Sequence, residues 1–299
     1  MTVDDETIDI LLPHYGDVEY LRLAVDSVRA QTDTRWRLIC VDDASPSSAG
    51  HEWISSLDDP RIVAIRNEEN LGVARNFARC LDLSTAEWFV MMGADDVMMP
   101  RYLETVRRAA ARTPAADIVQ PGVQVIDDDG KPAHPLPDLV KKLLRPRTRN
   151  GDRVLVGEPF AVSLARADWA YFPSLLWRRA SVAVHGFDAS YDVALDLALL
   201  LDIAMAGGTL RVTDDVCFQY RRHARSFSQA TAVSGLRFDQ ERRFFQHYAG
   251  RLRSRGWNRA ARVARRRTVS RLNAAAESVV ALFGGRMRDA RRLAAYVVR

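Results

Sequence analysis

The sequence is poor in cysteine, and this shortage narrows the kinds of site that it can build. Its three cysteines, Cys40, Cys80 and Cys217, are odd in number and widely spaced. They form no C-x-x-C pair of the kind that holds structural zinc, so a cysteine metal site and a disulfide framework are both disfavoured. We therefore expect buried, reduced thiols in a cytosolic protein.

Long uncharged apolar runs are also missing. No stretch reaches the roughly 18 apolar residues that are needed to span a membrane. The most apolar segment, residues 195–208, is interrupted by Asp196 and Asp202. The first residues, MTVDDETIDILLP, are acidic where a secretory signal would be basic. We expect a cytoplasmic protein.

Glycine-rich phosphate-binding signatures are absent as well. The chain contains no G-x-G-x-x-G and no glycine loop that ends in GK[ST]. A nucleotidyltransferase built on a parallel α/β sheet would need a glycine-rich signature after its first strand. The corresponding segment here, PHYGDVEY, does not contain one. That function is kept only as an alternative.

What the chain does have is the composition of a folded protein. Of its 299 residues, 47% are hydrophobic and 27% are charged, which suits one large domain or two modest ones. The net charge of +5 is concentrated in the arginine-rich end of the chain, whereas the first half is mildly acidic. Residues 231–299 are expected to form a basic helical region.

Short apolar runs alternate with helical patterns in the first part of the chain. We expect strands near residues 8–12, 36–41, 61–65 and 88–92, and helices near 18–30, 72–81 and 100–111. This alternation predicts an α/β fold with a doubly wound, mostly parallel sheet. Ligands of such sheets bind beyond the carboxyl ends of the strands, where PHY, VDDAS and GADD fall.

The second part of the chain is less regular. One or two strands are expected in residues 117–126. The polar stretch 127–160 is interpreted as a mobile loop or lid. A helix is expected over 196–206, closed by Gly207 and Gly208, and VCFQY reads as a strand that leads into a basic loop.

Adjacent aspartates, Asp95 and Asp96, follow the apolar run of residues 88–92. Burying two carboxylates together is costly unless a divalent cation lies between them and another anion. Mg²⁺ and Mn²⁺ bind through one or two carboxylates and complete their shell with substrate phosphates. A solvated turn or a helix N-cap is the alternative, and both interpretations stay open on local grounds.

The other polar clusters each have two interpretations. Asp42 and Asp43 could accept a hydrogen bond from the imide N–H of a uracil or thymine base. Alternatively, they could cap a turn. Tyr15 could stack on a base or be a rim aromatic. Gly72 could expose helix amides to a phosphate, with Arg75 as charge complement, or could be a simple turn.

Taken together, the segments ILLPHYGDVEYLRLAVDSVRAQT, WRLICVDDAS, NLGVARN and WFVMMGADDVMMP resemble the family 2 glycosyltransferases of the GT-A fold. The resemblance covers about residues 8–110 closely and resumes through FDASYDVALDLALLLDIAMAGG and YRRHARSFS. It implies a GT-A catalytic domain over residues 1–230, with a nucleotide-sugar half (1–120) and an acceptor and base half (121–230). The basic helical region, 231–299, would follow this domain.

The resemblance implies a donor site at the carboxyl ends of the first strands. Tyr15 and Asp43 would hold the base, with Asp42 supporting the turn. Asp95 matches the last carboxylate of the DXD motif, which ligates Mn²⁺ or Mg²⁺ on the diphosphate, and Gly93 stands where the first aspartate is usual. His223 and Asp96 are further metal-ligand candidates. The whole donor set is Pro13, Tyr15, Asp42, Asp43, Asn70, Gly72, Arg75, Ala94, Asp95, Arg221 and Arg222.

The catalytic base implied by the resemblance is Asp196, with Leu195 where the family has glutamate. A leucine-rich surrounding would raise its pKa by desolvation, although Asp196 could also be a plain helix N-terminal acid. Trp177 and Arg178 are implied to touch the acceptor, and core packing is the other reading of Trp177.

The expected reaction is transfer of a sugar from a UDP-, dTDP- or GDP-sugar to a hydroxyl, with inversion. The acceptor would be a sugar, a lipid-linked molecule or a small molecule, in cell-surface polysaccharide, glycolipid or secondary-metabolite glycosylation. A non-catalytic nucleotide-sugar-binding relative is the alternative. The arginine-rich end could lie on the anionic inner face of the membrane or pack on the catalytic domain, and nucleic acid is disfavoured because aromatic interleaving is sparse.

Overall fold

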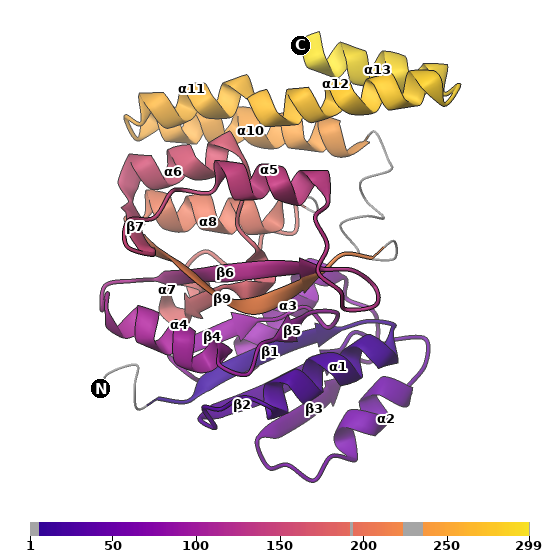
Figure 1. The fold of residues 1–299 in the computed structure, drawn as a ribbon, viewed down its shortest axis with the longest axis vertical. Helices are drawn as coiled ribbons and strands as arrows, with labels where there is room; N and C mark the ends of the chain where they lie inside the picture. The colour runs from indigo at the N-terminus through magenta and orange to yellow at the C-terminus, as the bar shows by residue number, and fades with distance from the viewer. Residues whose placement is uncertain (1–5, 192–193, 224–235, 299) are drawn as a thin grey trace.

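The computed structural model of the chain describes residues 6–191, 194–223 and 236–298. Its first part alternates strands and helices, as the apolar pattern predicts (Figure 1). The elements are β1 (Ile8–His14), α1 (Val18–Arg29), β2 (Trp36–Asp42), α2 (Ala49–Ser55), β3 (Ile62–Arg66), α3 (Val73–Leu83), β4 (Trp88–Met91), β5 (Val97–Met98) and α4 (Tyr102–Ala111). Asp17 caps α1 by accepting the amides of Glu19 and Tyr20.

The second part adds elements that complete the sheet and cover it. They are β6 (Ile118–Ile126), α5 (Leu136–Leu144), β7 (Asp152–Val156), α6 (Gly157–Arg166), the short 3₁₀ helix η1 (Phe172–Ser174), β8 (Leu176–Arg178), α7 (Arg179–Ala183), α8 (Leu195–Met205) and β9 (Thr209–Arg221). The C-terminal helices are α10 (Leu236–Ser254), α11 (Asn258–Arg266), α12 (Thr268–Phe283) and α13 (Met287–Val298). The basic loop expected after β9 lies, from residue 224 on, outside the described residues.

One sheet runs in the order β3-β2-β1-β4-β8-β6-β9-β5, with β7 paired to β9. The strands β1 to β4 are mutually parallel, and β9 is parallel to β6. Because β8 is antiparallel to both β4 and β6, those two strands share a direction. The sheet is thus mixed but mostly parallel, and the predicted α/β fold with flanking helices is confirmed.

Alternating side chains of the strands build two apolar cores, one on each face of the sheet. Ile8, Ile10 and Leu12 of β1 pack with α1, α2 and α4. Leu11 points to the opposite face, where α3, α6 and α8 pack. The helices α10 and α11 join this second core and form a further layer above α6 and α8 (Figure 1). All three cysteines are buried and free, as expected.

The expectation of a loop or lid over residues 127–160 is wrong. The stretch contains α5, β7 and the start of α6, and β7 pairs along its whole length with β9. The sequence pattern did not predict α5 because its one buried residue is Asp138 and three of its four leucines are exposed, the reverse of the usual amphipathic pattern. Among the described residues, no helix combines the length and apolar content needed to cross a membrane.

Candidate functional site

The parallel strands bring their carboxyl ends to one edge of the sheet. The strand β1 ends at His14, level with Asp42 at the end of β2. The strands β4 and β9 end at the same edge, with Met91 and Arg221. We call this the carboxyl edge. The polar segments PHY, VDDAS and GADD all lie along it, as the sequence predicts.

Asp43, directly after β2, holds the loop that leads into α3. Its buried carboxylate accepts hydrogen bonds from the amides of Leu71 (2.9 Å) and Gly72 (2.9 Å) and from the side chain of Asn67 (2.7 Å). Asn70 donates to the carbonyl of Asp43 at 3.1 Å. Gly72 has φ +79°, a conformation that favours glycine. The predicted donor residues Asp43, Asn70 and Gly72 thus form one connected loop.

The predicted donor residues beside this loop differ in whether their side chains are used in contacts within the protein. Asp42 is buried and accepts hydrogen bonds from Ser45 and Arg66, so it supports the turn that follows β2. Tyr15 is 58% exposed, and Arg75 is exposed on the first turn of α3. The side chains of Tyr15 and Arg75 are therefore accessible to a ligand, whereas the Asp42 carboxylate stabilises the turn after β2.

The turn from β4 to β5 carries Asp95 and Asp96, whose carboxylates fold back over Gly93. A Cβ atom at Gly93 would lie 2.6 Å from Asp96 Oδ2 and 2.8 Å from Asp95 Oδ1. A side chain at this position would therefore require both carboxylates to shift. Asp96 is 1% exposed, and burial followed by the charge of Asp95 raises its pKa well above the usual range.

Arg221, at the end of β9, stabilises the turn that carries Asp95 and Asp96. The Arg221 amide donates to Asp96 Oδ1 (2.9 Å), and its side chain donates to the carbonyls of Asp95 (2.8 Å) and Asp127 (2.9 Å). Arg221 is 3% exposed. It was predicted to contact the donor directly, but its buried side chain acts instead as a clamp on the backbone of the Asp95 turn.

The chemistry of this turn suits a hard divalent cation. His223 Nε2 lies 2.8 Å from Asp95 Oδ2, and Asp96 Oδ2 is buried without a hydrogen-bond partner in the described part of the chain. Carboxylate oxygens are the ligands that suit Mg²⁺ and Mn²⁺, whereas an imidazole nitrogen is a softer ligand. No group of three or more acidic, histidine or cysteine side chains is arranged as a complete metal site within the described residues. A cation here would need further oxygen ligands, such as those of a diphosphate.

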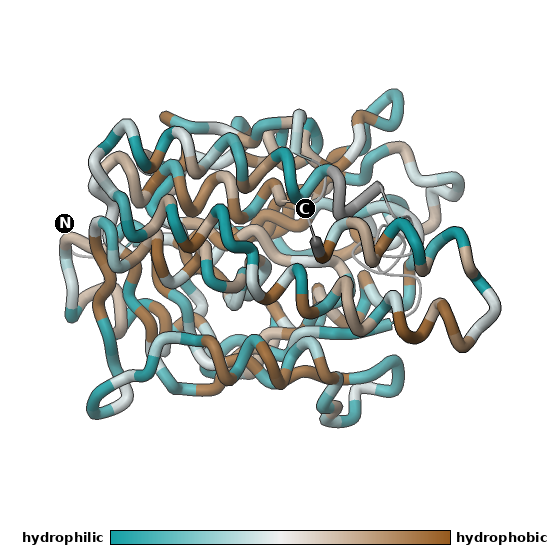
Figure 2. The backbone as a smooth tube through the Cα atoms, turned by 90° about the horizontal axis from the view of Figure 1, so that it is seen from above, coloured by the Kyte–Doolittle hydropathy of each residue, from teal (hydrophilic) through white to brown (hydrophobic). Residues whose placement is uncertain are grey.

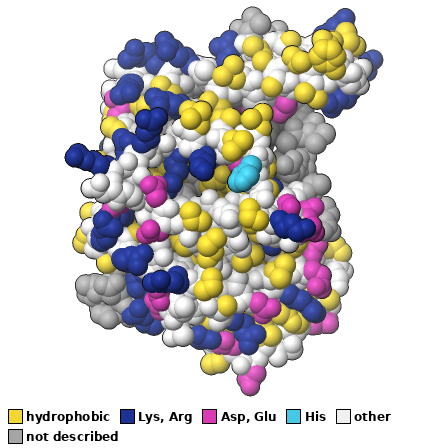
Figure 3. All heavy atoms as spheres, viewed as in Figure 1, with side chains coloured by type: hydrophobic (Ala, Val, Ile, Leu, Met, Phe, Trp, Pro, Cys, Tyr) yellow, Lys and Arg dark blue, Asp and Glu magenta, His cyan; other side chains and the backbone are white. Residues whose placement is uncertain are grey.

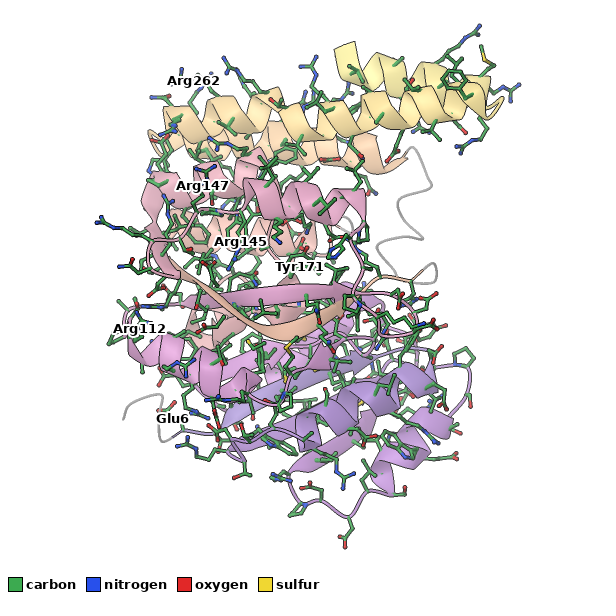
Figure 4. The ribbon with its side chains drawn as sticks, viewed as in Figure 1. Glu6, Arg112, Arg145, Arg147, Tyr171 and Arg262 are labelled. Atoms are coloured by element: carbon green, nitrogen blue, oxygen red, sulfur yellow. The ribbon has the colours of Figure 1, made fainter. Side chains whose placement is uncertain are left out.

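A second cluster begins at the next residue of the chain. Arg222 forms two 3.1 Å hydrogen bonds with the buried carboxylate of Asp138 on α5. Tyr171 donates to the same carboxylate at 3.0 Å and lies between α5 and the sheet (Figure 4). Burial, and then the charge of Asp138, raises the pKa of Tyr171, so the phenol stays protonated and continues to donate. Arg222 is therefore held by α5.

Asp196 lies on the first turn of α8, beside this second cluster. Burial, and next the charge of Asp168, raises the pKa of Asp196 to about 7, while the charge of Lys141 opposes the shift. Lys141 Nζ lies 3.8 Å from Asp168 Oδ2 and donates to the carbonyl of Ala170 at 3.0 Å. Asp196 also accepts the amide of Leu197 at 2.8 Å. A carboxyl group with this pKa is suited to take up a proton near neutral pH.

The two clusters meet at the end of β9, because Arg222 and His223 are neighbours in the chain. The helix α8 leads through Gly207 and Gly208 into the start of β9, at the opposite edge of the sheet. Its first turn, with Asp196, therefore lies toward the carboxyl edge. The structure thus places Asp43, Asp95 and Asp196 toward one edge of the sheet.

The acceptor contacts expected of Trp177 and Arg178 are wrong. Trp177 is fully buried in β8, where its ring packs against Phe172. Arg178 pairs with Trp88, the first residue of β4, and therefore lies at the opposite edge of the sheet. It donates there to the carbonyls of Ala116 and Pro114. Neither side chain can reach an acceptor at the carboxyl edge.

Four residues of the second cluster escaped the sequence interpretation: Asp138, Lys141, Asp168 and Tyr171. The first two lie on α5, in the stretch that was interpreted as a loop. Their partners are 27 to 84 residues away in the chain. The three-residue spacing of Asp138 and Lys141, which places both on one face of a helix, was the available signal.

Comparison with known proteins shows that the chain is similar to glycosyltransferases. The model of glycosyl transferase family 2 matches residues 9–172. An uncharacterized glycosyltransferase of Methanocaldococcus jannaschii is 25% identical over 131 residues, 43% of this chain and 45% of that protein. The putative colanic acid biosynthesis glycosyl transferase WcaA of Escherichia coli is 30% identical over 97 residues, 32% of this chain and 35% of that protein. The chain thus spans less than half the length of these relatives.

A solved structure with a similar fold is that of residues 1–349 of S. aureus TarS in complex with UDP-GlcNAc. It has a TM-score of 0.63 and 13% identity, and the match covers 80% of this chain and 65% of that chain. At this identity the likeness concerns the fold. The arrangement of strands and flanking helices is therefore shared with a structure that holds a nucleotide-sugar.

Proposed function

The chain belongs to glycosyl transferase family 2, with the fold expected of a GT-A member, and from this we propose that it moves a sugar from a nucleoside-diphosphate sugar to an acceptor hydroxyl. The observation that supports this most is the alignment of Asp43, Asp95 and Asp196 along one edge of the sheet. A donor-binding loop, a cation-binding turn and a proton acceptor are the three parts that such a transfer requires.

The donor would lie along the first strands. Tyr15 offers an exposed ring on which the base can stack, and Asp43 would face the base from its loop through Oδ2, which accepts the Gly72 amide. Arg75, exposed on the first turn of α3, would balance the charge of the phosphates. Pro13, near the end of β1, and Ala94, beside Asp95, are the remaining residues proposed for the donor site.

Asp95 would hold Mn²⁺ or Mg²⁺, with His223 and Asp96 beside it. When bound, the ion would supply positive charge that stabilises the leaving diphosphate. Arg221 keeps the Asp95 turn in place by binding its backbone, and Arg222 adds positive charge at the same edge. These residues thus bind and orient the diphosphate end of the donor.

Asp196 would act as the general base. It would take the proton of the acceptor hydroxyl, whose oxygen then attacks the anomeric carbon on the face opposite the diphosphate. A bond to the acceptor oxygen forms as the bond to the diphosphate oxygen breaks, so the anomeric configuration inverts. Sugar, lipid-linked and small-molecule acceptors all carry such hydroxyls, in cell-surface polysaccharide, glycolipid or secondary-metabolite glycosylation.

Incubation with UDP-, GDP- and dTDP-sugars in the presence of Mn²⁺ tests the proposal. We expect release of one nucleoside diphosphate, measured by a coupled assay, with one donor strongly preferred. Binding of a nucleotide-sugar without release under any acceptor condition would instead identify a non-catalytic relative. Release of pyrophosphate from a nucleoside triphosphate and a sugar phosphate would identify a nucleotidyltransferase.

Activity is expected to rise with pH up to about 7. The base must be ionised, so kcat/KM should fall about tenfold for each pH unit below the raised pKa of Asp196 and level off above it. Lys141 lowers this pKa, so Lys141→Met should move the rising limb to higher pH. The measurement is the pH profile of kcat/KM. Lys142→Met, at the exposed neighbouring position on α5, is the matched control and should leave the limb in place.

A further inference from the structure

The helix α5 turns its leucines toward solvent. Leu136 is 72% exposed, Leu139 46% and Leu143 78%. Their spacing of three and four residues places them on one face of the helix. Exposed leucines are unremarkable one at a time, but three in a row on one helix face form an apolar stripe that water solvates poorly. We call these residues the leucine stripe.

The opposite face of α5 fixes this orientation. Asp138 binds Arg222 through two hydrogen bonds, and Lys141 donates to the carbonyl of Ala170 at 3.0 Å. Arg145, just after the helix, donates to Asp214 at 3.0 Å. Rolling the helix to bury its leucines would break these polar contacts. The leucine stripe is therefore held outward by the polar cluster on the other side of the helix.

The surroundings of the leucine stripe are cationic. Between residues 131 and 150 the chain has six basic residues and one acid, the buried Asp138. Lys142 and Arg147 are exposed, and Arg145 and Arg147 lie near the end of α5 in Figure 4. Figure 3 shows hydrophobic side chains over α5 with basic side chains beside them. The surface therefore combines apolar contact area with a rim of positive charge.

A second surface of the same character lies at the turn between α12 and α13. Phe283 is 87% exposed, Val280 63% and Met287 49%. Arg286 and Arg288 flank them and are exposed. Hydrophobic colour marks the end of α12 in Figure 2, and in Figure 3 this tip appears on the same face of the molecule as α5. Two apolar groups with basic borders thus face the same way.

We propose that the leucine stripe and the α12–α13 tip dock the protein on an anionic lipid bilayer. Leucine, valine and phenylalanine side chains enter the boundary between headgroups and acyl chains, while lysine and arginine bind lipid phosphates. A second copy of the chain fits less well, because both surfaces are cationic and would repel their own kind. A bilayer satisfies the apolar and the cationic parts of the surface together.

Docking through α5 would place the catalytic cluster close to the lipid headgroups. The outer face of α5 would touch the membrane, and its inner face carries Lys141, whose charge acts on Asp196. If the proposed function holds, the acceptor hydroxyl belongs to a lipid-anchored molecule. This last step rests on the proposed function, whereas the docking itself does not.

Vesicle binding by the full chain tests the docking. The probes are phosphatidylcholine vesicles with and without about one third phosphatidylglycerol. We expect co-sedimentation with the anionic vesicles only, weakened by high salt. The double variant Leu136→Asp/Leu143→Asp should partition at least about tenfold less. Val184→Asp, at a 79% exposed position after α7, is the matched control and should bind like wild type.

Site-specific labelling shows which surface touches lipid. The native cysteines are all buried, so Leu143→Cys and Phe283→Cys can each be labelled selectively with a polarity-sensitive dye. We expect a blue shift at both positions on adding anionic vesicles, and none at Val184→Cys. Absence of vesicle binding, or binding that survives the double variant, would overturn the proposal. So would a dimer in gel filtration that the double variant converts to monomer.

The same variants separate docking from catalysis. The double variant should keep its melting temperature and its release of nucleoside diphosphate in solution, because no residue of the donor or base clusters is changed. Vesicle binding without any donor turnover would leave the docking in place and reject the proposed function. Donor turnover without vesicle binding would support the proposed function and reject the docking.

Discussion

Replacing Asp196 with asparagine is expected to lower kcat by about 10³-fold, the range that a general base contributes. Donor affinity should stay close to that of wild type, because Asp196 lies in the second cluster and not in the donor loop. The asparagine Oδ1 can still accept the Leu197 amide, so the start of α8 should keep its form. Steady-state kinetics and calorimetric titration with the preferred nucleotide measure the two quantities separately.

A matched control lies on the same helix. Asp202 is six residues further along α8, and its carboxylate binds Tyr248 and Arg251 of α10. Asp202→Asn should affect stability more than turnover, and its kcat should remain within a few-fold of wild type. The residual activity of Asp196→Asn should also lose the rise with pH near 7. Normal turnover by Asp196→Asn would show that another group takes the proton.

The positions of Asp43 and Asp95 in the fold could be predicted because their signals are local. Each strand is a short apolar run, and the acids follow directly at its carboxyl end, so sequence order alone places Asp43 and Asp95 at one edge. The helix Val18–Arg29 and its Asp17 cap follow in the same way from adjacent residues. Such features need no knowledge of distant parts of the chain.

The second cluster could not be predicted because its residues are far apart in the sequence or lie on a helix whose leucines are exposed. Asp138 meets Arg222 across 84 residues, and no local pattern announces that pair. The apolar face of α5 is exposed, so the rule that leucines mark the buried face points the wrong way. Arg221 resembles a phosphate-binding arginine in the sequence, yet its burial against backbone carbonyls makes it a clamp. The Asp138–Arg222 pair, the orientation of α5 and the role of Arg221 all depend on tertiary contacts that local sequence patterns do not indicate.

Gly93 shows how a departure from a family pattern can have a local cause. In the sequence it is a missing aspartate, which keeps a non-catalytic protein among the alternatives. In the structure the space of its side chain is filled by the carboxylates of Asp95 and Asp96. The two remaining acids therefore take up the position toward which a first aspartate would point. Glycine at this position removes one carboxylate but leaves those of Asp95 and Asp96 at the turn.

Asp95→Asn tests this turn, and we expect it to weaken Mn²⁺-dependent donor binding by at least about 100-fold, the upper range for residues that merely support a metal ligand. Asparagine keeps the size of the side chain but removes the negative charge that a divalent cation requires. Calorimetric titration of the preferred nucleotide with and without Mn²⁺ measures the loss directly, and the paramagnetic resonance signal of free Mn²⁺ measures the ion itself. Neither readout depends on turnover.

The control for this variant should change an aspartate of another turn on the surface. Asp129 is exposed in the turn after β6 and pairs with Lys131, so Asp129→Asn should bind nucleotide and Mn²⁺ like wild type. Asp96 is a poorer choice, because its Oδ1 accepts the Arg221 amide and its removal would disturb the fold. If Asp95→Asn still bound nucleotide in a Mn²⁺-dependent manner, the cation would have to lie elsewhere. The partly buried pair of Asp95 and His223 would then be a structural contact, and Arg75 would be the exposed cation left to balance the diphosphate.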